Sequence, residues 1–477
     1  MAKGKVKPEN GMQARAAALP GAKDLGLPRE FPGAIHYGKD EADAVLRVIH
    51  NKSPFRYYGP QCGFEVKQFE EEFARFIASE PGMPWPDTSK YFVTAVNSGT
   101  GALEIALDAL GVGCGDEVIT QGFMWVSTIS AIIRNRAIPV LVDSDDTMNM
   151  DPAALKERIT DRTKVVIPVP MLGGCARIGK IMEIIREVNR DRARRGLPLV
   201  RVLEDNAQSL GAHATGCQGS VVAGKAGTYR IGTFGDVGIF SLQINKNMTA
   251  GEGGVIVTRD KALHQRIDAL HNAGFLKAVG TPSKNWYGDE PVGWGQGRRM
   301  TEMQAAIARV QLTKLDSILG KMRESHDRIE ACIKRLGLVP RARADPANPG
   351  DTGYYCIFHL PWHDAPDDVK IKRGRAIAEA LDAYGLRPWF MHDFEIHVYY
   401  NIPQLVGKWP LNNGCPWHCA RNAFHVNYKY DRGTLPHLDE LLVTSVGINV
   451  PSQLTREQEE KVADVLVAVH DKYIKQA

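Results

Sequence analysis

Short apolar runs alternate with amphipathic segments along the chain from about residue 91. The runs have the length and composition of buried strands: YFVTAV, EVIT, IPVLVD, KVVIPV and LVRVLED. Between them, residues 102–111 and 181–196 repeat apolar positions at the spacing of one helical face and end at a glycine. This alternation predicts an α/β fold with a mostly parallel sheet between helices. Because such sheets bind ligands at the carboxyl ends of their strands, functional residues are expected directly after the runs.

The order of these patterns also predicts how the chain divides into domains. A polar N-terminal arm, residues 1–37, precedes a large α/β domain over residues 38–298, which ends in a connection rich in Gly, Trp and Pro. An amphipathic helix over residues 299–337 then leads into a smaller C-terminal α/β domain, residues 338–477. The length of 477 residues exceeds one ordinary core, which agrees with two domains.

Composition argues against several classes of partner. The formal net charge of +4 is small for this length, and no basic block with interleaved aromatic residues suggests a nucleic-acid surface. No stretch approaches about 18 consecutive apolar residues, so no membrane span is expected. The eight cysteines stand at irregular spacings, unlike a disulfide framework. A cytoplasmic protein is therefore expected.

Three short motifs resemble binding sites without meeting their requirements. GCPWHC brings Cys415, His418 and Cys419 together but lacks a second ligand pair at zinc-site spacing, so packing is favoured and no metal is expected. Residues 219–226 resemble a phosphate-binding loop, yet end in alanine where a Ser or Thr is required. Residues 111–116, GVGCGD, follow a helical pattern and are interpreted as a helix stop and turn.

Two of the strand ends carry groups that suit a flat, phosphorylated ligand. NSGTGA, residues 97–102, opens a helix whose N–H groups can hold a phosphate, although Ser98 or Thr100 can equally serve as a simple helix cap. Trp125 follows EVIT, where its indole can stack on a planar ring or belong to the core. The residues alone leave these alternatives open.

Two further strand ends carry ionisable groups. EDNAQS places Glu204, Asp205 and Gln208 after LVRVL, where an acid can cap a turn or hold a ring nitrogen protonated. Lys246 stands in LQINKNMTAGEGG, after VGIFSL and before a glycine-rich turn. A phosphate cradle, a stacking ring, a carboxylate and an amine are together what pyridoxal 5'-phosphate requires.

The chain resembles the DegT/DnrJ/StrS family of sugar aminotransferases, which are fold-type I pyridoxal-phosphate enzymes. The resemblance runs from about Gly38 to near the C-terminus and includes NSGTGALEIALDALGVGCGDEVI, EDNAQSLGAH, GDVGIFSLQINKNMTAGEGGVI and RRMTEMQAAIARVQL. It implies a large domain with a seven-stranded type of sheet and a smaller C-terminal domain. It also implies pyridoxal 5'-phosphate as the cofactor.

The resemblance assigns roles to the residues at the strand ends. Lys246 would form the Schiff base and move the proton, with Asp205 at the pyridine nitrogen. Other positions that match the family's cofactor contacts are Gln208 at the phenolic oxygen, Trp125 on the ring, and Gly99, Thr100 and Ser241 at the phosphate.

The chain departs from the family pattern at several positions. Asn245 precedes the lysine where the family often has Ser or Thr, and Gly297 stands where the family has an asparagine that reaches the neighbouring subunit's phosphate. Gln296 is a candidate to replace that asparagine. The longer segment 216–231 is expected to shape either substrate choice or dimer contacts, and His397 lies near the substrate or has a structural role.

The predicted activity is transfer of an amino group from glutamate or glutamine to the carbonyl of a sugar-like acceptor, in amino-sugar biosynthesis. The acceptor can be a nucleotide-linked ketosugar, a keto-cyclitol, a sugar phosphate or an oxidised sugar acid. One alternative is a sugar dehydratase of the same fold, in which histidine replaces the lysine, and Lys246 speaks against it. The other is a non-catalytic, regulatory cofactor-binding protein. A homodimer with each active site at the subunit boundary is expected.

Overall fold

A seven-stranded sheet forms the centre of the larger part of the protein. The structure is a computed structural model that describes residues 23–28, 31–79, 91–274 and 293–475. The strand order is β1-β9-β8-β5-β4-β2-β3. The strands are β1 (Phe92–Val96), β2 (Glu117–Gln121), β3 (Ile138–Val142), β4 (Thr163–Ile167), β5 (Arg201–Asp205), β8 (Val237–Ser241) and β9 (Gly254–Thr258).

The prediction of a mostly parallel sheet is confirmed, with one reversal. Strands β2, β3, β4, β5 and β8 run parallel, whereas β9 is antiparallel to both of its neighbours, β1 and β8. The reversal follows from the short connection over residues 242–253, because antiparallel neighbours need no crossover helix between them. That short connection is the segment that contains Lys246.

Helices cover both faces of this sheet, as the alternation of patterns predicts. Within β4, Val165 belongs to the hydrophobic cluster on one face and Val166 to the cluster on the other, as a strand buried on both sides requires. The helices along the large sheet are α3 (Gly99–Ala109), α4 (Val126–Arg134), α5 (Pro152–Arg158), α6 (Ile178–Arg194) and α7 (Lys261–His271).

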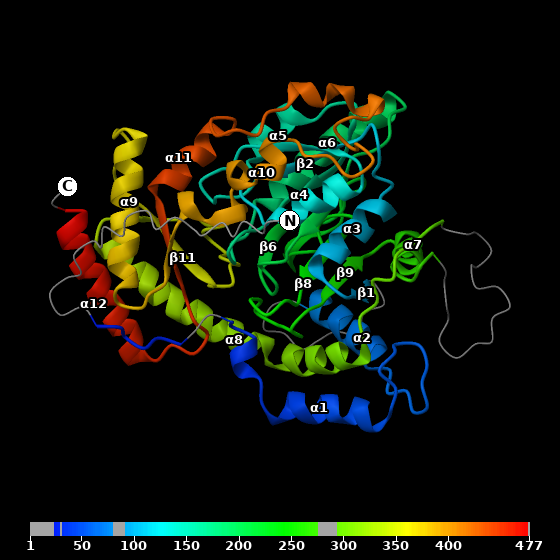
Figure 1. Ribbon diagram of the computed structural model, residues 1–477, viewed down its shortest axis with the longest axis horizontal. Coiled ribbons are helices and arrows are strands. Elements are labelled where there is room, and N and C mark those ends of the chain that lie inside the picture. Colours follow the sequence, from blue (N-terminus) through cyan, green and yellow to red (C-terminus); the bar gives the residue numbers. More distant parts are fainter. Residues whose placement is uncertain (1–22, 29–30, 80–90, 275–292, 476–477) are drawn as a thin grey trace, which may run out of the picture.

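A long helix connects the two parts of the molecule. Helix α8 (Glu302–Arg335) begins at a capping box formed by Thr301 and Gln304 and runs along the bottom of the view in Figure 1. Its first half packs against α1 (Lys39–His50) and α2 (Glu65–Ala78). Its second half contributes Ile329 and Ile333 to the core of the smaller sheet.

The smaller sheet is four-stranded and antiparallel, in the order β10-β11-β13-β12. Its strands are β10 (Val339–Pro340), β11 (Tyr355–His359), β12 (Pro388–Phe390) and β13 (Ser445–Asn449), and its helices are α9 (Asp367–Asp382), α11 (Pro436–Thr444) and α12 (Arg456–Tyr473). The described part of the N-terminal arm joins this unit, because Leu27 is buried in its core.

Two further segments complete the chain. The residues that the sequence marked at 216–231 form a two-stranded hairpin of β6 (His213–Cys217) and β7 (Ala226–Arg230). Residues 391–427 contain the short helices η2 (Met391–Asp393), η3 (Glu395–His397), η4 (Tyr399–Asn401), α10 (Pro403–Val406) and η5 (Ala420–Asn427). Among the described helices, none is both long and apolar enough to cross a membrane.

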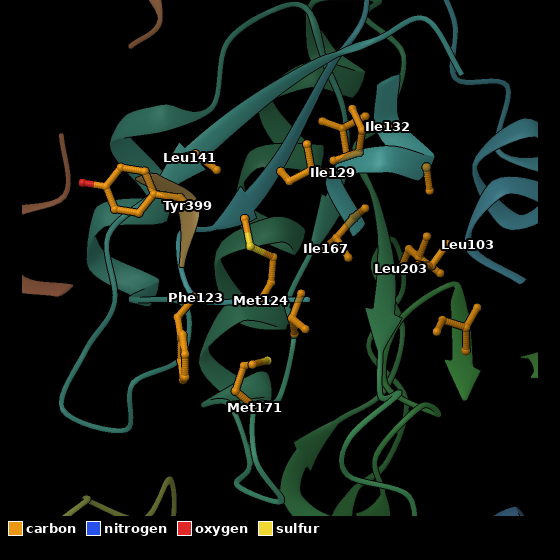
Figure 2. Packing of buried hydrophobic residues seen from close by; sticks show 14 of the residues in the cluster. Leu103, Phe123, Met124, Ile129, Ile132, Leu141, Ile167, Met171, Leu203 and Tyr399 are labelled. Atoms are coloured by element: carbon orange, nitrogen blue, oxygen red, sulfur yellow. The ribbon is translucent and has the colours of Figure 1, made fainter. Parts of the chain in front are cut away.

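The segment after β12 returns to the large sheet and packs into its core. Figure 2 shows Tyr399 beside Leu141, Phe123 and Met124, with its hydroxyl directed away from the cluster. That hydroxyl donates to the carboxylate of Asp439, with both oxygens at 3.0 Å. This packing holds η3 at the carboxyl ends of the large sheet's strands, where the backbone N–H of Met124 donates to the carbonyl of His397 at 2.9 Å.

Candidate active site

A cavity of about 470 Å³ lies at the carboxyl ends of the large sheet's strands. Every residue to which the resemblance assigned a role lines it: Gly99, Thr100, Trp125, Asp205, Gln208, Ser241 and Lys246. Other walls come from the smaller unit, through Tyr354, Tyr355, Trp389, Phe394, Glu395 and His397. The strand ends that are scattered along the sequence therefore meet in one place.

The N-terminus of α3 forms one end of the cavity. Ser98 caps the helix, because its hydroxyl accepts the backbone N–H of Gly101 at 3.0 Å. The cap does not exclude anion binding, since the first N–H groups of a helix also attract a negative group. The hydroxyl of Thr100 lies 2.8 Å from that of Ser127, so the helix end carries hydroxyls as well as backbone N–H groups.

Gly99 allows this helix end to approach the adjacent strand. A Cβ at Gly99 would lie 2.9 Å from the Cβ of Ser241 and 3.1 Å from its hydroxyl oxygen. Any side chain would push Ser241 away, so glycine keeps the hydroxyl of Ser241 next to the helix N-terminus. The residues that the sequence associated with a phosphate thus form one compact cradle.

Asp205 is a buried carboxylate at the last position of β5. One oxygen accepts the hydroxyl of Thr128 at 2.7 Å, and the other accepts the backbone N–H of Ala207 at 3.2 Å. Burial raises the pKa of Asp205, while Thr128, the N–H of Ala207 and the charge of Lys246 lower it. The carboxylate is therefore held by donors in the one orientation that faces the cavity.

Glu204, its neighbour on the strand, has a different environment. Its carboxylate accepts the backbone N–H groups of Gly232, Phe234 and Gly235, each at 2.8 Å. Burial raises the pKa of Glu204 to about 7, against the effect of these three donors. Glu204 organises the turn before β8 and is absent from the cavity wall, so Asp205 is the acid of this strand end that faces the cavity.

Lys246 lies in the turn between β8 and β9. Burial lowers the pKa of its ammonium to about 8, although the carboxylates of Asp205 and Glu252 raise it. A pKa near 8 leaves an appreciable neutral fraction of the amine near neutral pH, which a nucleophile or a general base requires. The backbone N–H of Gly33, in the N-terminal arm, donates to the carbonyl of Lys246 at 3.1 Å and fixes the turn from behind.

Gln208 presents a donor to the cavity. Its side-chain oxygen accepts the backbone N–H of Leu172 at 3.0 Å. This contact fixes which atom of the amide is the acceptor and leaves the Nε2 group as a donor on the cavity side. Gln208 can therefore donate to an oxygen of a bound ring.

Trp125 forms a wall of the cavity and is 40% exposed, which separates it from the core tryptophans. Its ring lies 4.7 Å from that of His397, and His397 in turn stacks on Phe394 at 4.1 Å and 8°. Burial, and then the charge of Lys246, lowers the pKa of His397 to about 4, so this imidazole is neutral at physiological pH. The planes of Trp125 and His397 are inclined at 51°, so the three rings form an angled aromatic wall.

The sequence did not reveal several residues of the site. Thr128 and Ser127 follow Trp125 at the start of α4, and no motif distinguishes them from ordinary helix residues. Phe394 and Glu395 come from the returning segment, which only the three-dimensional packing places here. His397, for which the sequence left a substrate contact and a structural role open, lines the same cavity as Lys246.

Gln296 lies outside the cavity wall. It is exposed, and its side-chain oxygen accepts the Nε–H of Arg298 at 2.9 Å. The backbone nearby contacts the phosphate end of the site, because the carbonyl of Arg298 accepts the N–H of Asn97 at 2.9 Å. Residues 275–292, which precede this segment, lie outside the described residues.

Comparison of the sequence with known proteins shows the family to which the chain belongs. Residues 38–373 match the DegT/DnrJ/EryC1/StrS aminotransferase family. The chain belongs to this family. It is 35% identical over 331 residues to the L-glutamine:2-deoxy-scyllo-inosose aminotransferase of Streptomyces fradiae, which covers 69% of this chain and 70% of that enzyme. It is 33% identical over 308 residues to the L-glutamine:scyllo-inosose aminotransferase of Streptomyces griseus, covering 62% of each.

A solved structure with the same fold supports the assignment of this chain to the DegT/DnrJ/EryC1/StrS aminotransferase family. The 3-amino-5-hydroxybenzoic acid synthase superposes with a TM-score of 0.70 at 25% identity, over 94% of this chain and all of that one. The protein is therefore an aminotransferase with the fold-type I architecture, and pyridoxal 5'-phosphate is its cofactor. The cavity fits that cofactor: Gly99 leaves the phosphate cradle open, and a buried carboxylate and a buried amine share the same walls.

Proposed function

We propose that this aminotransferase transfers the amino group of glutamine to the ketone of a cyclitol, a polyhydroxylated carbocyclic ring. The observation that carries the proposal is the single cavity in which Lys246, Asp205 and the cradle at Gly99 meet. The choice of donor and acceptor is supported by relatives whose names specify L-glutamine and inososes. Family membership among aminotransferases, together with the retained Lys246, favours amination over the dehydratase and regulatory alternatives.

Each residue has a distinct task in this proposal. When bound, the cofactor supplies a conjugated ring that accepts electron density from the donor's α-carbon. The N–H groups at the start of α3 and the hydroxyls of Thr100 and Ser241 bind its phosphate. Asp205 holds the proton at the ring nitrogen, and the Nε2 group of Gln208 donates to the phenolic oxygen.

Lys246 would hold the cofactor through its Nζ. Burial lowers the pKa of this amine to about 8, so the same atom would be able to take the proton from the donor's α-carbon and give it up again, as a general base and then a general acid. Trp125 and His397, whose ring centroids lie 4.7 Å apart, would form the aromatic wall beside which the ring and the acceptor are oriented. A neutral His397 adds no positive charge beside the amine, which keeps that amine's pKa from falling further.

The walls of the cavity suit a neutral polyol acceptor. Glu252 and Glu395 line the cavity and offer carboxylate oxygens that accept hydrogen bonds from ring hydroxyls. The same carboxylates repel a phosphate or an acidic sugar. The amide side chains of Gln243 and Asn245 add further donors and acceptors. A keto-cyclitol is therefore favoured over sugar phosphates, nucleotide-linked sugars and sugar acids.

The test separates the two half-reactions. Cofactor-loaded enzyme is mixed with glutamine, glutamate or alanine, and the cofactor's visible absorbance is followed in a stopped-flow instrument. The aminated enzyme is then offered scyllo-inosose, 2-deoxy-scyllo-inosose or a nucleotide-linked 4-ketosugar, with Lys246→Ala as the inactive control. We expect glutamine to react fastest and an inosose to restore the absorbance. Restoration by the nucleotide-linked sugar alone would overturn the choice of acceptor, and no reaction with any donor would overturn the activity.

We further propose a cytoplasmic homodimer in which Gln296 reaches the partner's cofactor phosphate. Trp294 is 95% exposed and stands in the segment that crosses the phosphate end of the site. The guanidinium of Arg299 in this segment lies 5.4 Å from the ring of Phe55, which in turn packs edge-on against Tyr57 and Tyr58. Aromatic residues and arginine are enriched at protein interfaces. All eight cysteines are free thiols, in keeping with a reducing compartment.

Sedimentation velocity tests the dimer, and fluorescence titration of the apoenzyme with cofactor tests the contact. We expect a dimer at micromolar concentration and weaker cofactor binding in Gln296→Ala. Gln265→Ala serves as the control, because this glutamine is exposed on α7. An active monomer would contradict the shared site, and an unchanged cofactor affinity would exclude Gln296.

A further inference from the structure

Three cysteine sulfurs from distant parts of the chain meet outside the active-site cavity. Cys114 lies in the loop between α3 and β2, and Cys415 and Cys419 lie between α10 and η5. The three sulfur atoms are all within 4.8 Å of one another. The sulfurs of Cys114 and Cys415 are 3.9 Å apart, although 301 residues separate them in the sequence. None of these residues lines the cavity that contains Lys246.

The 3.9 Å between the sulfurs of Cys114 and Cys415 is close to one edge of a tetrahedral metal site. Zinc–sulfur bonds of about 2.3 Å in tetrahedral geometry place ligand sulfurs about 3.8 Å apart. A disulfide would instead need a sulfur–sulfur distance of about 2.05 Å. All three cysteines are free thiols. The cluster therefore has room for a cation between its sulfur atoms.

The surrounding backbone fixes the two cysteine loops around the cluster. Asn422 is fully buried; its side-chain oxygen accepts the N–H of Gly115 at 2.6 Å, and its Nδ2 group donates to the carbonyls of Arg136 and Pro416 at 3.0 Å. These bonds tie the loop of Cys114 to the segment of Cys415 and Cys419. Such outer contacts orient ligands in metal sites.

The closeness of the three sulfurs also bears on their charge. Three thiolates within 4.8 Å of one another repel, so an ionised cluster requires a positive charge among the sulfurs.

We propose that Cys114, Cys415 and Cys419 bind one structural Zn²⁺ as thiolates and that His418 completes the tetrahedron. His418 lies between two of the ligands in the sequence and is exposed, so its imidazole is free to turn toward the sulfurs. Zinc fits because it is redox-inert and favours tetrahedral thiolate and imidazole ligands. Binding releases the thiol protons to solvent.

The site would fasten the returning segment to the large domain. Tyr428 and Tyr430 follow Cys419, and their hydroxyls donate to Glu117 at 2.8 Å and to the carbonyl of Pro139 at 2.6 Å. These contacts hold the chain after Cys419, and the metal would hold residues 415–419. The sequence motif GCPWHC lacked a second ligand pair, and the fold supplies Cys114 in its place.

Cysteine footprinting on the wild-type enzyme tests the proposal directly. The full-length protein is incubated with one equivalent of Zn²⁺, freed of excess metal, pulsed with an alkylating reagent and digested for mass analysis. We expect one zinc per chain by elemental analysis and protection of Cys114, Cys415 and Cys419. A strong chelator should remove both the zinc and the protection. Failure of the wild type to retain zinc, or a mass two daltons lower from a disulfide among these residues, would overturn the site.

Variants then assign the ligands, with a matched control. Cys114→Ser, Cys415→Ser and Cys419→Ser should each bind less than a tenth of the zinc, whereas Cys217→Ser, which removes a thiol elsewhere, should retain one equivalent. Co²⁺ bound to the wild type should show the intense visible bands of a tetrahedral thiolate complex. His418→Ala should release zinc to a chelator at least tenfold faster. Zinc retention in all three serine variants would refute the cluster, and unchanged release from His418→Ala would refute the fourth ligand.

Discussion

Replacing Thr128 by valine should change the pH dependence of the enzyme. The hydroxyl of Thr128 donates to Asp205 at 2.7 Å in a fully buried setting, and valine preserves the side chain's shape while removing that donor. A hydrogen bond to a charged group contributes about 1.5–3 kcal/mol, and about 1.36 kcal/mol corresponds to one pKa unit. The pKa of Asp205 should therefore rise by about one to two units.

The direction of the change follows from the role of Asp205. The residue acts as a carboxylate, so activity is lost as the pH falls through its pKa, which burial has already raised. Loss of Thr128 raises that pKa further and moves the acidic limb of the pH–rate profile to higher pH. Well above both pKa values the two enzymes should approach the same rate, apart from a smaller loss from poorer positioning of the carboxylate.

The assay is the single-turnover rate of cofactor amination by glutamine, measured across the pH range. Thr120→Val is the matched control, because this equally buried threonine donates to the neutral carbonyl of Ile167 at 3.0 Å. Both variants should lose comparable thermal stability, and only Thr128→Val should shift the acidic limb. An unshifted limb in Thr128→Val, or an equal shift in the control, would refute the reasoning.

Four further substitutions test other parts of the site. Lys246→Ala should fold normally, and its turnover should fall by about a hundred- to ten-thousand-fold or more, because a positioned base typically contributes that factor to the rate. Borohydride reduction should attach the cofactor to the peptide that contains Lys246 in the wild type and not in this variant. Asp205→Asn should keep the melting temperature of the wild type and lose turnover. Glu204→Gln should instead lose about 1–3 kcal/mol of free energy of unfolding and keep its activity. The reverse outcome would show that the roles of the two acids are exchanged. Gly99→Ala should weaken cofactor binding roughly five- to hundredfold through overpacking of about 1–3 kcal/mol, and equal affinity in a fluorescence titration would contradict the proposed cradle.

The parts of the site that lie at strand ends were accessible from the sequence. Lys246, Asp205 and the NSGTGA turn each follow a buried apolar run, and the carboxyl ends of neighbouring strands meet at one edge of a sheet. The reversal of β9 was not accessible, because strand direction depends on how the short connection after β8 folds back. Apolar periodicity contains no information about direction.

The parts formed by long-range packing could not be predicted. Phe394 stacks on His397 only because Tyr399 anchors the returning segment in the core of the large sheet. Cys114 meets Cys415 across 301 residues of chain. No local sequence pattern predicts these long-range contacts, because they depend on the packing of many side chains together. The domain boundaries at 298 and 337 likewise stay a prediction from pattern alone.

Helix α8 has a consequence for how the protein can be divided. Its first half contributes Leu312 and Leu315 to one core, and its second half contributes Ile329 and Ile333 to another. The returning segment crosses in the opposite direction and places Tyr399 in the large core. A truncation on either side of α8 would therefore expose apolar surface on both fragments. The smaller unit should aggregate when it is expressed alone or exchanged between relatives. Segments that can be exchanged between relatives are therefore expected to be surface loops.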